Sequence, residues 1–383
     1  MKHTEHISLK EARRIILYRQ GLLSPLSDIF SVKDYCERLG YVQIDTISVV
    51  ERAHHHVLYN RMGKYIIPML DIALEKEKSI FEYWSHAASY LPMCDYRYSL
   101  VRKKYISEGS TTWFSEDLDV QSSLLTYIRE NGAVQSNDFD HEHSSQKKGG
   151  WWSWKPTKKA LEHLFMKGDL MIARREGFRK IYDIPERVLP SDIDTTFPTP
   201  QEYLDYCIYS TINAQGLASI DDMTHLRSAS HKKNIQKRLD ELLRNTSLIP
   251  VEIESLNQLY YSTSDILAEQ IPKNKKRVHI LSPFDNLIIR RKKVKEIFNF
   301  DYTIECYVPE HKRVYGYFSL PILYGTEFIG RIDCKAERKN QIFIIKGLFP
   351  EGQRDKEELY RIIEPTLSNF ALWNGCQEIQ WQK

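Results

Sequence analysis

The tripeptide Gln43-Ile44-Asp45 places an amide and a carboxylate two positions apart in a stretch of β-like residues. Successive side chains of a strand point to opposite faces, so Gln43 and Asp45 would share one face, about 7 Å apart. Such a pair can hold a water molecule, and an ionised Asp45 can take its proton. Its charge could also stabilise a cationic, oxocarbenium-like sugar. On spacing alone, however, a Gln-x-Asp pattern is more typical of an ordinary solvent-facing strand edge.

Three consecutive histidines, His54-His55-His56, follow this tripeptide. Adjacent positions on a helix point about 100° apart, so three in a row cannot converge on one metal ion. The chain has no HExxH motif and no cysteine close to these histidines, so we predict no metal site. His54 and His55 are candidate neighbours of Asp45. His86, in the motif EYWSHAAS, is either a buried, hydrogen-bonded histidine or a further residue of the active site.

The sequence lacks the usual motifs of nucleophilic and nucleotide-dependent enzymes. It has no GxSxG elbow, no Walker A loop and no GxGxxG after a strand. Its six cysteines are scattered without a CxxC pair, which argues against a zinc ribbon or a disulfide framework. We therefore expect chemistry that needs neither a cofactor nor a covalent nucleophile.

Composition limits the class of protein. The 383 residues suggest two to four domains, and a hydrophobic content of 42% can supply their cores. No apolar run approaches the roughly 18 residues that span a bilayer, and the N-terminus does not resemble a signal peptide, so we expect a cytoplasmic protein without membrane contact. The net charge is only +3, but ten Lys and Arg stand against three Asp and Glu over 146–180, and nine against one over 273–295. Such clusters are typical of proteins that bind polyanions, and also of solvated helix faces.

Short elements must position the tripeptide. Ser8-Leu9-Lys10-Glu11 is a capping box that predicts the start of a helix. A second helix fits 31–39, and the strand that carries the tripeptide fits 41–47. A longer helix over 69–84 ends this first, weaker unit.

The order helix, helix, helix, hairpin occurs twice further along the chain, and it is the order of a winged helix. In the first copy we expect helices at 121–130, 136–139 and 158–167 and a hairpin over 169–185 that turns at Glu176-Gly177. In the second copy we expect helices at 201–215, 219–226 and 231–244 and two strands around 255–257. Together with the weaker first unit, these patterns suggest a tandem array.

Beyond about residue 278, strand runs alternate with turn residues, which fits a small β-barrel or sandwich. The runs are 302–308, 313–323, 327–337 and 341–349, and a last helix fits 355–373. The sequence therefore predicts an α+β chain with domains at 1–115, 116–196, 197–272 and 273–383.

Winged-helix modules most often bind duplex DNA, and some mediate only protein contacts. Basic side chains occur on the third helix and the wing of the first winged-helix copy, and on the third helix of the second copy. These are the parts of such a module that meet phosphates. The candidates are Lys155, Lys158, Lys159, Arg174, Arg175, Arg179, Lys232, Lys233, Lys237 and Arg238. Contacts of this type give affinity and salt dependence rather than sequence readout.

Three long motifs, in this order, resemble the AlkZ/YcaQ-type bacterial DNA glycosylases. They are VQIDTISVVERAHH, FEYWSHAASYLP and LSPFDNLIIRRKKVKEIFNFDYTIECYVPEHKRVYGYFSLPIL. The resemblance covers nearly the whole chain, from Ser8 to the last helix. It implies three tandem winged-helix domains and a C-terminal β-barrel, arranged as a C-shaped clamp around duplex DNA.

The resemblance also implies the chemistry. The family motif is Gln, an apolar residue, then Gln or Asp, so it assigns Gln43 and Asp45 as catalytic, in the version found in the broader-substrate YcaQ-like branch. The family excises N7-alkylated guanine and unhooks interstrand crosslinks joined through that nitrogen. We therefore expect a monomeric, monofunctional glycosylase that acts on double-stranded DNA without a metal ion or a cofactor.

Two other classes of protein fit parts of the sequence. A non-enzymatic winged-helix regulator or DNA-structure binder would bind DNA tightly and release no base. A metal-dependent nuclease would use Asp45 with the histidines, and a chelator would inhibit it.

Overall fold

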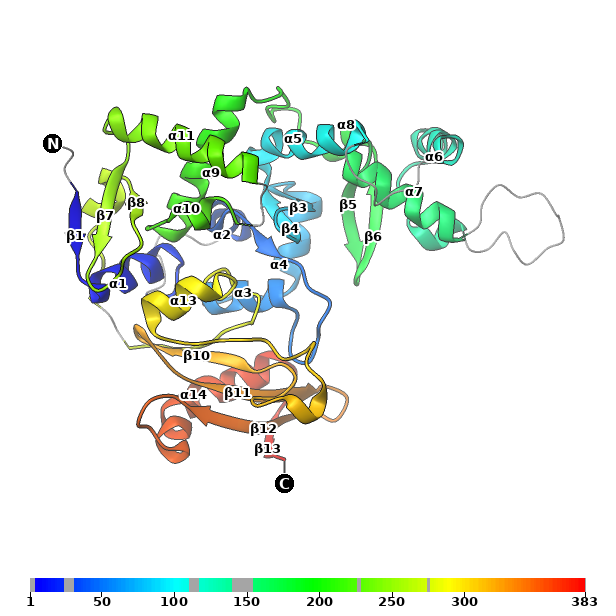
Figure 1. The fold of residues 1–383 in the computed structure, drawn as a ribbon. Coiled ribbons are helices and arrows are strands. Elements are labelled where there is room, and N and C mark those ends of the chain that lie inside the picture. The colour runs from blue at the N-terminus through cyan, green and yellow to red at the C-terminus, as the bar shows by residue number, and fades with distance from the viewer. Residues whose placement is uncertain are drawn as a thin grey trace. The chain divides into compact units, whose positions relative to one another are not determined.

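The computed structural model describes residues 4–23, 31–109, 117–139, 154–225, 229–273 and 276–382. Helices and strands are mixed along the chain, in agreement with the predicted α+β class (Figure 1). The chain divides into two compact units, the first unit (Met1–Ile66 with Leu204–Lys383) and the second unit (Ile67–Tyr203). The predicted domain boundaries stay a prediction. Within the described ranges, no helix is long and apolar enough to cross a membrane.

Among the described residues, three helices lie in the N-terminal part of the first unit, and capping residues predict the start of the first and both ends of the second. The helices are α1 (Leu9–Arg19), α2 (Val32–Leu39) and α3 (Ala53–Arg61). The Ser8 hydroxyl accepts a hydrogen bond from the Glu11 amide at 3.2 Å, which satisfies one free N–H of the first turn of α1. Ser31 and Asp34 form the reciprocal capping box of α2, and Gly40 ends this helix in the left-handed conformation with φ of +75°.

Further elements of the first unit follow in the order predicted over 201–262. They are α9 (Pro200–Gln215), which begins at the boundary between the units, α10 (Ile220–Met223), α11 (Ala229–Arg244), β7 (Ile249–Ile253), β8 (Tyr260–Ser262) and α12 (Ser264–Ala268). Strand β1 (Glu5–Ile7) pairs in parallel with β7, and β7 pairs antiparallel with β8. The start of the chain is thereby part of a sheet built by residues far along it.

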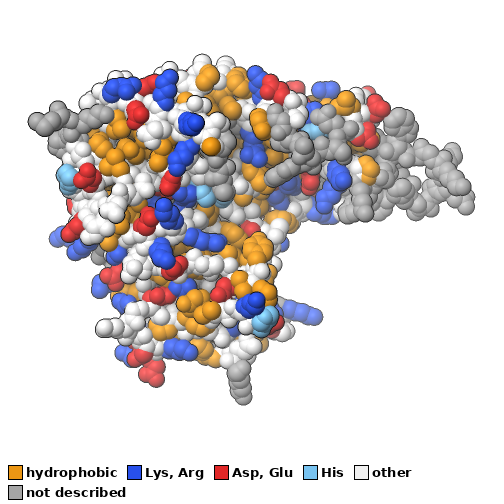
Figure 2. Space-filling view, viewed as in Figure 1, with side chains coloured by type: hydrophobic (Ala, Val, Ile, Leu, Met, Phe, Trp, Pro, Cys, Tyr) orange, Lys and Arg blue, Asp and Glu red, His pale blue; other side chains and the backbone are white. Residues whose placement is uncertain are grey.

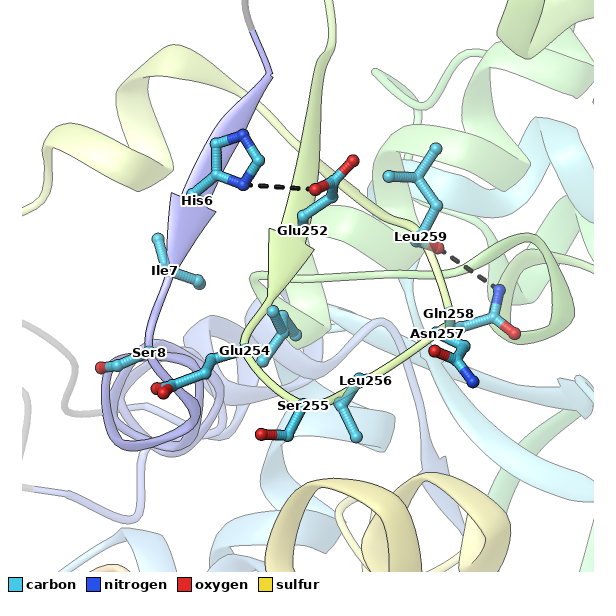
Figure 3. A pocket seen from close by; sticks show the side chains of 11 residues that line it. His6, Ile7, Ser8, Glu252, Glu254, Ser255, Leu256, Asn257, Gln258 and Leu259 are labelled. Carbon is cyan, nitrogen blue, oxygen red and sulfur yellow. Dashed lines mark hydrogen bonds and ion pairs between the residues drawn. The ribbon is translucent and has the colours of Figure 1, made fainter.

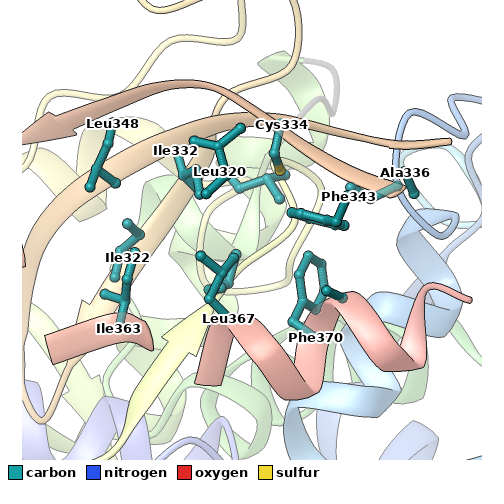
Figure 4. Close-up of a cluster of buried hydrophobic side chains, with 14 of the residues drawn as sticks. Leu320, Ile322, Ile332, Cys334, Ala336, Phe343, Leu348, Ile363, Leu367 and Phe370 are labelled. Atoms are coloured by element: carbon teal, nitrogen blue, oxygen red, sulfur yellow. The ribbon is translucent and has the colours of Figure 1, made fainter. Parts of the chain in front are cut away.

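A five-stranded sheet with one covering helix forms a large core in the first unit. The strand order is β13-β12-β11-β10-β9, with β9 (Val278–Ile280), β10 (Leu320–Tyr324), β11 (Glu327–Glu337), β12 (Ile342–Pro350) and β13 (Glu378–Trp381); helix α13 (Arg291–Phe298) follows β9. Helix α14 (Lys356–Trp373) lays Ile363, Leu367 and Phe370 against the sheet (Figure 4). The Phe370 ring lies 5.7 Å from that of Phe343 on β12. The sheet is compatible with the predicted barrel-like domain, with β9 and β13 as its two edges.

The second unit contains the elements predicted for a winged helix over 121–185. Its elements are α4 (Pro68–Asp71), a π-helical turn (Ile72–Lys76), β3 (Ile80–Trp84), β4 (Ala88–Pro92), α5 (Tyr96–Ser107), α6 (Leu118–Asn131), α7 (Trp154–Lys167), β5 (Met171–Glu176), β6 (Arg179–Asp183) and α8 (Pro185–Val188). Helix α6 ends at Gly132, and the β5–β6 hairpin turns at Gly177, as predicted. A single turn of 3-10 helix, Ser136–Phe139, stands where the short second helix was expected.

The predicted helix over 69–84 is wrong in its second half. The helical backbone ends at Lys76, and Ile80–Trp84 forms strand β3, paired antiparallel with β4. Its β-branched and aromatic side chains favour a strand. The charged residue within it, Glu82, is buried and accepts hydrogen bonds from two Arg175 nitrogens, both at 2.8 Å. A distant guanidinium thus stabilises a carboxylate that the local sequence alone would place on an exposed helix face.

Lys103 of α5 is a buried cation in a box of aromatic rings. Its ammonium nitrogen lies 4.0 Å from the ring centre of Tyr96, 5.0 Å from that of Tyr83 and 5.9 Å from that of Phe81. The described part of the chain holds no carboxylate paired with it. Burial lowers the pKa of Lys103 to about 7, because the charged form is poorly solvated there.

We predict that Lys103→Met stabilises the protein near and below neutral pH. A pKa that falls from 10.5 to about 7 on folding corresponds to a cost on the order of 5 kcal/mol, offset in part by the ring contacts. The folded state binds fewer protons than the unfolded state between these values, so stability rises with pH across that window and the full cost remains below pH 7. The variant should raise the free energy of unfolding at pH 6 by about 1–3 kcal/mol, with a smaller gain at pH 9.

Urea denaturation at both pH values measures this effect. Lys104→Met on the same helix changes an exposed lysine and serves as the control, which should leave stability within about 0.5 kcal/mol. Equal gains for Lys103→Met at pH 6 and pH 9 would contradict the charge-burial explanation.

Candidate functional site

The predicted strand over 41–47 is wrong beyond Gln43. Strand β2 consists of Val42–Gln43 alone, and Asp45 lies in the irregular segment that follows. The Asp45 carboxylate accepts a hydrogen bond from the Ile47 amide at 2.7 Å, a local turn that competes with strand pairing. The two polar side chains therefore do not share a regular strand face. Gln43 is buried, with 7% of its surface exposed, and Asp45 is half-buried.

The environment of Asp45 suits a proton acceptor. Burial raises the pKa of its carboxyl above the ordinary value, while hydrogen bonds from the amides of Ile47 and Thr46 lower it in part. The amide bonds fix the direction of the carboxylate, and the partial burial strengthens its affinity for a proton. An oriented, partly desolvated carboxylate can position a water molecule and take a proton from it.

Contacts with the C-terminal half of the chain fix the segment that carries Asp45. The Asn286 side chain donates to the Tyr41 carbonyl at 2.9 Å. Further on, the Ala336 amide of β11 donates to the Val49 carbonyl at 2.9 Å. The tripeptide is thus held on both sides by residues of the same compact unit, which gives an irregular segment a defined geometry.

The three consecutive histidines lie on α3 and are all buried. His55 Nδ1 lies 2.6 Å from the Tyr65 hydroxyl, and His56 Nε2 lies 2.7 Å from the Ile280 carbonyl oxygen. Burial lowers the pKa of both His55 and His56 to about 4, so both rings are uncharged near neutral pH. Among the described residues, no group of three His, Cys, Asp or Glu side chains is placed to hold a metal ion.

These contacts give His55 and His56 structural partners. The rings of His54 and His55 lie 4.3 Å apart, which keeps both on the same part of α3. His86 belongs to the second unit, in the turn between β3 and β4. The roles predicted for His54, His55 and His86 beside Asp45 stay predictions.

A buried ion pair joins α3 to the segment after β9. The guanidinium of Arg61 donates to both carboxylate oxygens of Asp285, at 2.7 and 2.9 Å, and neither side chain is exposed. Arg61 also donates to the carbonyl oxygens of Gln20 at 2.8 Å and Val57 at 3.0 Å. One arginine therefore joins α3 to the Gln20 segment and to the Asp285 segment.

The structure separates the predicted DNA-binding residues into two groups. Exposed side chains are Lys158, Lys159, Arg179, Lys232, Lys233 and Lys237, with Arg174 partly exposed beside Glu176. The side chain of Lys155 lies outside the described residues. Arg175 is buried against Glu82, and Arg238 donates to Asp205 at 2.6 and 2.9 Å and to Glu241 at 2.9 Å. As placed, neither of these two guanidinium groups is available to a DNA phosphate, so we leave both out of the interface proposed below.

The surface charge is mixed. On the face shown in Figure 2, Lys and Arg side chains are interspersed with Asp and Glu. Lys232, for example, lies 2.7 Å from the carboxylate of Asp221. Local counts of basic residues in the sequence therefore overstate the charge that is available to a polyanion.

The strand runs predicted over 302–308 and 313–323 are also largely wrong. Only Leu320–Tyr324 is a strand, and residues 302–319 form a loop with one turn of 3-10 helix, Glu310–Lys312, here called the 302–319 loop. The buried carboxylate of Glu305 accepts hydrogen bonds from the amides of Val314 at 3.0 Å and Tyr315 at 2.7 Å. Those amides are therefore bonded to a side chain instead of a neighbouring strand. The sequence pattern predicts strands here, so the backbone of this loop and the placement of its aromatic and basic residues are seen only in the structure.

A pocket of about 720 Å³ lies at the end of β1 and β7 (Figure 3). At its wall, His6 Nδ1 lies 3.2 Å from a carboxylate oxygen of Glu252. Glu252 and Glu254 make the lining unfavourable for a DNA phosphate, and the pocket contains neither Gln43 nor Asp45.

Comparison with known proteins decides the family. A model of the AlkZ-like DNA glycosylase family matches residues 36–363, a range that includes Gln43, Asp45 and the 302–319 loop. The chain belongs to the AlkZ-like DNA glycosylase family. Membership confirms the resemblance and indicates a DNA glycosylase whose partner is DNA. Assignment to the Gln/Asp branch stays a prediction.

A solved structure supports the fold of this AlkZ-like protein. The DNA glycosylase AlkZ of Streptomyces sahachiroi is similar to the chain with a TM-score of 0.64 and 15% sequence identity, over 100% of both chains. At this identity, the likeness shows a shared fold.

Proposed function

We propose that this AlkZ-like protein hydrolyses the N-glycosidic bond of N7-alkylguanine in double-stranded DNA and unhooks crosslinks joined through that nitrogen. The observation that carries the proposal is Asp45, a half-buried carboxylate oriented by backbone amides on a fixed segment, two residues after the buried Gln43. Both lie in the part of the chain that matches the glycosylase family.

The chemistry requires little beyond these two side chains. Alkylation at N7 makes the purine cationic, so its bond to the sugar is weakened before the enzyme acts. A water molecule held by Gln43 and Asp45 attacks C1′, and Asp45 accepts its proton. The electron pair of the C1′–N9 bond passes to the purine, which leaves as neutral N7-alkylguanine. The negative charge of Asp45 also stabilises the oxocarbenium-like sugar as that bond breaks.

The same proposal covers the rest of the reaction. The tripeptide has no lysine, so we infer hydrolysis to an abasic site without a covalent enzyme–DNA intermediate. We infer that a monomer holds the duplex through three winged-helix domains and the barrel-like domain, and that no metal ion or cofactor takes part.

A base-release assay tests the proposal. A duplex with one N7-methylguanine is incubated with the protein in EDTA, and abasic sites are then cleaved by alkali. We expect base release in EDTA and strand cleavage only after alkali. Tight DNA binding without base release would favour a non-enzymatic regulator, and strand cuts without alkali that EDTA abolishes would favour a nuclease.

We propose that exposed lysines of α7 and α11 contact DNA phosphates. Lys159→Ala combined with Lys233→Ala should weaken duplex binding several-fold and reduce the slope of log Kd against log salt concentration by about 2, because each lost contact removes about 0.9. Fluorescence anisotropy at salt concentrations from about 50 to about 200 mM measures both the affinity and the slope. Lys335→Ala, an exposed lysine paired with Glu337 on β11, serves as the control. An unchanged slope in the double variant would remove these lysines from the interface.

A further inference from the structure

The 302–319 loop presents large apolar side chains to solvent. Tyr307 has 85% of its surface exposed, Val314 has 66% and Tyr317 has 37%. Exposed aromatic and aliphatic groups gathered on one loop are typical of a surface that contacts a ligand. A tyrosine as exposed as Tyr307 contributes little to the stability of the fold, so its position calls for another explanation.

The base of this loop is held firmly. Besides the Glu305 bonds to two loop amides, the Arg331 guanidinium stacks on the Tyr315 ring at 4.0 Å. Gly316 has φ of +96°, and a Cβ there would lie 1.9 Å from a carboxylate oxygen of Asp333, so only glycine fits. The Tyr302 hydroxyl donates to the Ser319 carbonyl at 2.7 Å at the end of the loop. The loop therefore holds its exposed side chains in a defined place before any ligand binds.

Asp45 and the tip of this loop belong to one neighbourhood. Ile47, two residues after Asp45, and Cys306, next to Tyr307, pack against the same apolar core. Burial raises the pKa of the Cys306 thiol, and the charge of Asp45 adds to that rise. The pKa of the Tyr307 hydroxyl is raised chiefly by Cys306 and, less strongly, by slight burial and by Asp45. The packing of Ile47 and Cys306 on one core is the geometric basis for this neighbourhood, and the two pKa shifts agree with it.

The two exposed tyrosines of the loop differ in one respect. The Arg313 guanidinium lies over the Tyr317 ring at 5.1 Å and donates to the Val308 carbonyl at 2.8 Å. The Tyr317 ring thus already has a cation within the protein. No Lys or Arg of the described residues lies over the Tyr307 ring.

We propose that Tyr307 binds the N7-alkylated base through its ring face, and that Tyr307 and Asp45 together select a positively charged purine over neutral guanine. This inference rests on the proposed function and names the residue that recognises its substrate. A cation over a tyrosine face is attracted by the ring quadrupole, and the Asp45 carboxylate adds a second attraction for the same charge. Undamaged guanine carries no charge and gains neither contribution. The preference is lost when the bond breaks, because the released base is neutral.

Binding to two uncleavable duplexes tests the inference. One duplex carries N7-methylguanine on a 2′-fluoroarabino sugar, which is cationic and resists hydrolysis, and the other carries 7-methyl-7-deazaguanine, its neutral analogue. Wild-type protein should bind the cationic duplex more tightly. Tyr307→Leu should reduce that preference about 5- to 20-fold, whereas Tyr307→Phe should keep it within about 2-fold, because the ring is retained.

Trp381→Leu on β13 is the matched control, since it also removes an exposed aromatic ring of the first unit and should leave the preference unchanged. If Tyr307→Leu lowers the affinity for both duplexes by the same factor, the inference is overturned, because Tyr307 would then be a general DNA contact. An unchanged preference in that variant would also overturn it. Failure of the proposed function is a separate result: wild-type protein would then release no N7-methylguanine in the base-release assay, whatever the two uncleavable duplexes show.

Discussion

Asp45→Asn should lower the single-turnover rate of N7-methylguanine release by about 100-fold or more, the usual scale of general-base catalysis. Asparagine keeps the size of the side chain and an oxygen that can accept from the Ile47 amide. It loses the charge that stabilises the sugar cation and the ability to take a proton from water. The affinity for an undamaged duplex should stay within about 2-fold, because the change adds no repulsion toward phosphates.

The pH dependence of the same rate provides a second measurement. Burial raises the pKa of Asp45 above its ordinary value, and only the ionised carboxylate accepts a proton. The usual pKa of aspartate is about 3.9. The wild-type rate should therefore fall on acidification at a pH above that value. The residual rate of Asp45→Asn should lack this acid limb.

Gln43→Glu is an informative companion variant. It replaces the buried amide by a carboxyl of the same size beside Asp45, which adds a like charge or an extra proton where the water is held.

Wild-type activity in Asp45→Asn together with an unchanged acid limb would remove Asp45 from the chemistry and favour a protein that only binds DNA.

Capping residues predicted the helix ends that they mark, whereas strand ends and the end of the helix predicted over 69–84 were predicted poorly. The caps at Ser8, Ser31 and Gly40 act over three or four residues, so the sequence contains everything that decides them. The strand predicted through Asp45 fails because its own carboxylate bonds the Ile47 amide. The strand predicted through Glu305 fails for a similar reason. The Glu305 carboxylate accepts hydrogen bonds from two backbone amides nine and ten residues further along the chain, and these amides therefore do not pair with a strand.

The candidate site was only partly predictable for the same reason. Gln43 and Asp45 are two positions apart in the sequence, and their types alone indicate what they could do together. Tyr307, which we propose as a further residue of the site, is far from them along the chain, and no local signal indicates that Ile47 and Cys306 pack against the same core. The ion pair of Arg175 with Glu82 could not be predicted either, because Glu82 lies on a strand where the sequence pattern predicts a helix.

Asp285→Asn should lower the free energy of unfolding by about 3–5 kcal/mol, because it leaves the buried Arg61 cation without its counter-charge. Both side chains are fully buried, and the pair is bidentate. Water cannot replace the lost carboxylate charge at such a site, so the full cost of the uncompensated guanidinium is paid. Arg61→Met should lower the free energy of unfolding by a similar amount. It leaves the buried Asp285 carboxylate without a counter-charge and removes the hydrogen bonds to Gln20 and Val57.

The double variant, with both Arg61→Met and Asp285→Asn, distinguishes charge from packing. Removal of both charges should cost clearly less than the sum of the single changes, by about 1–3 kcal/mol, because neither group is then left ionised and alone. Asp301→Asn breaks the exposed pair with Lys295 and is the matched control, expected to cost less than about 1 kcal/mol. Urea denaturation of all four variants gives the coupling, and strict additivity of the two single changes would show that the pair acts through shape and hydrogen bonds instead of charge. Because Arg61 also fixes α3 to the segments beside the tripeptide, the single variants should lose glycosylase activity at temperatures where Asp301→Asn retains it.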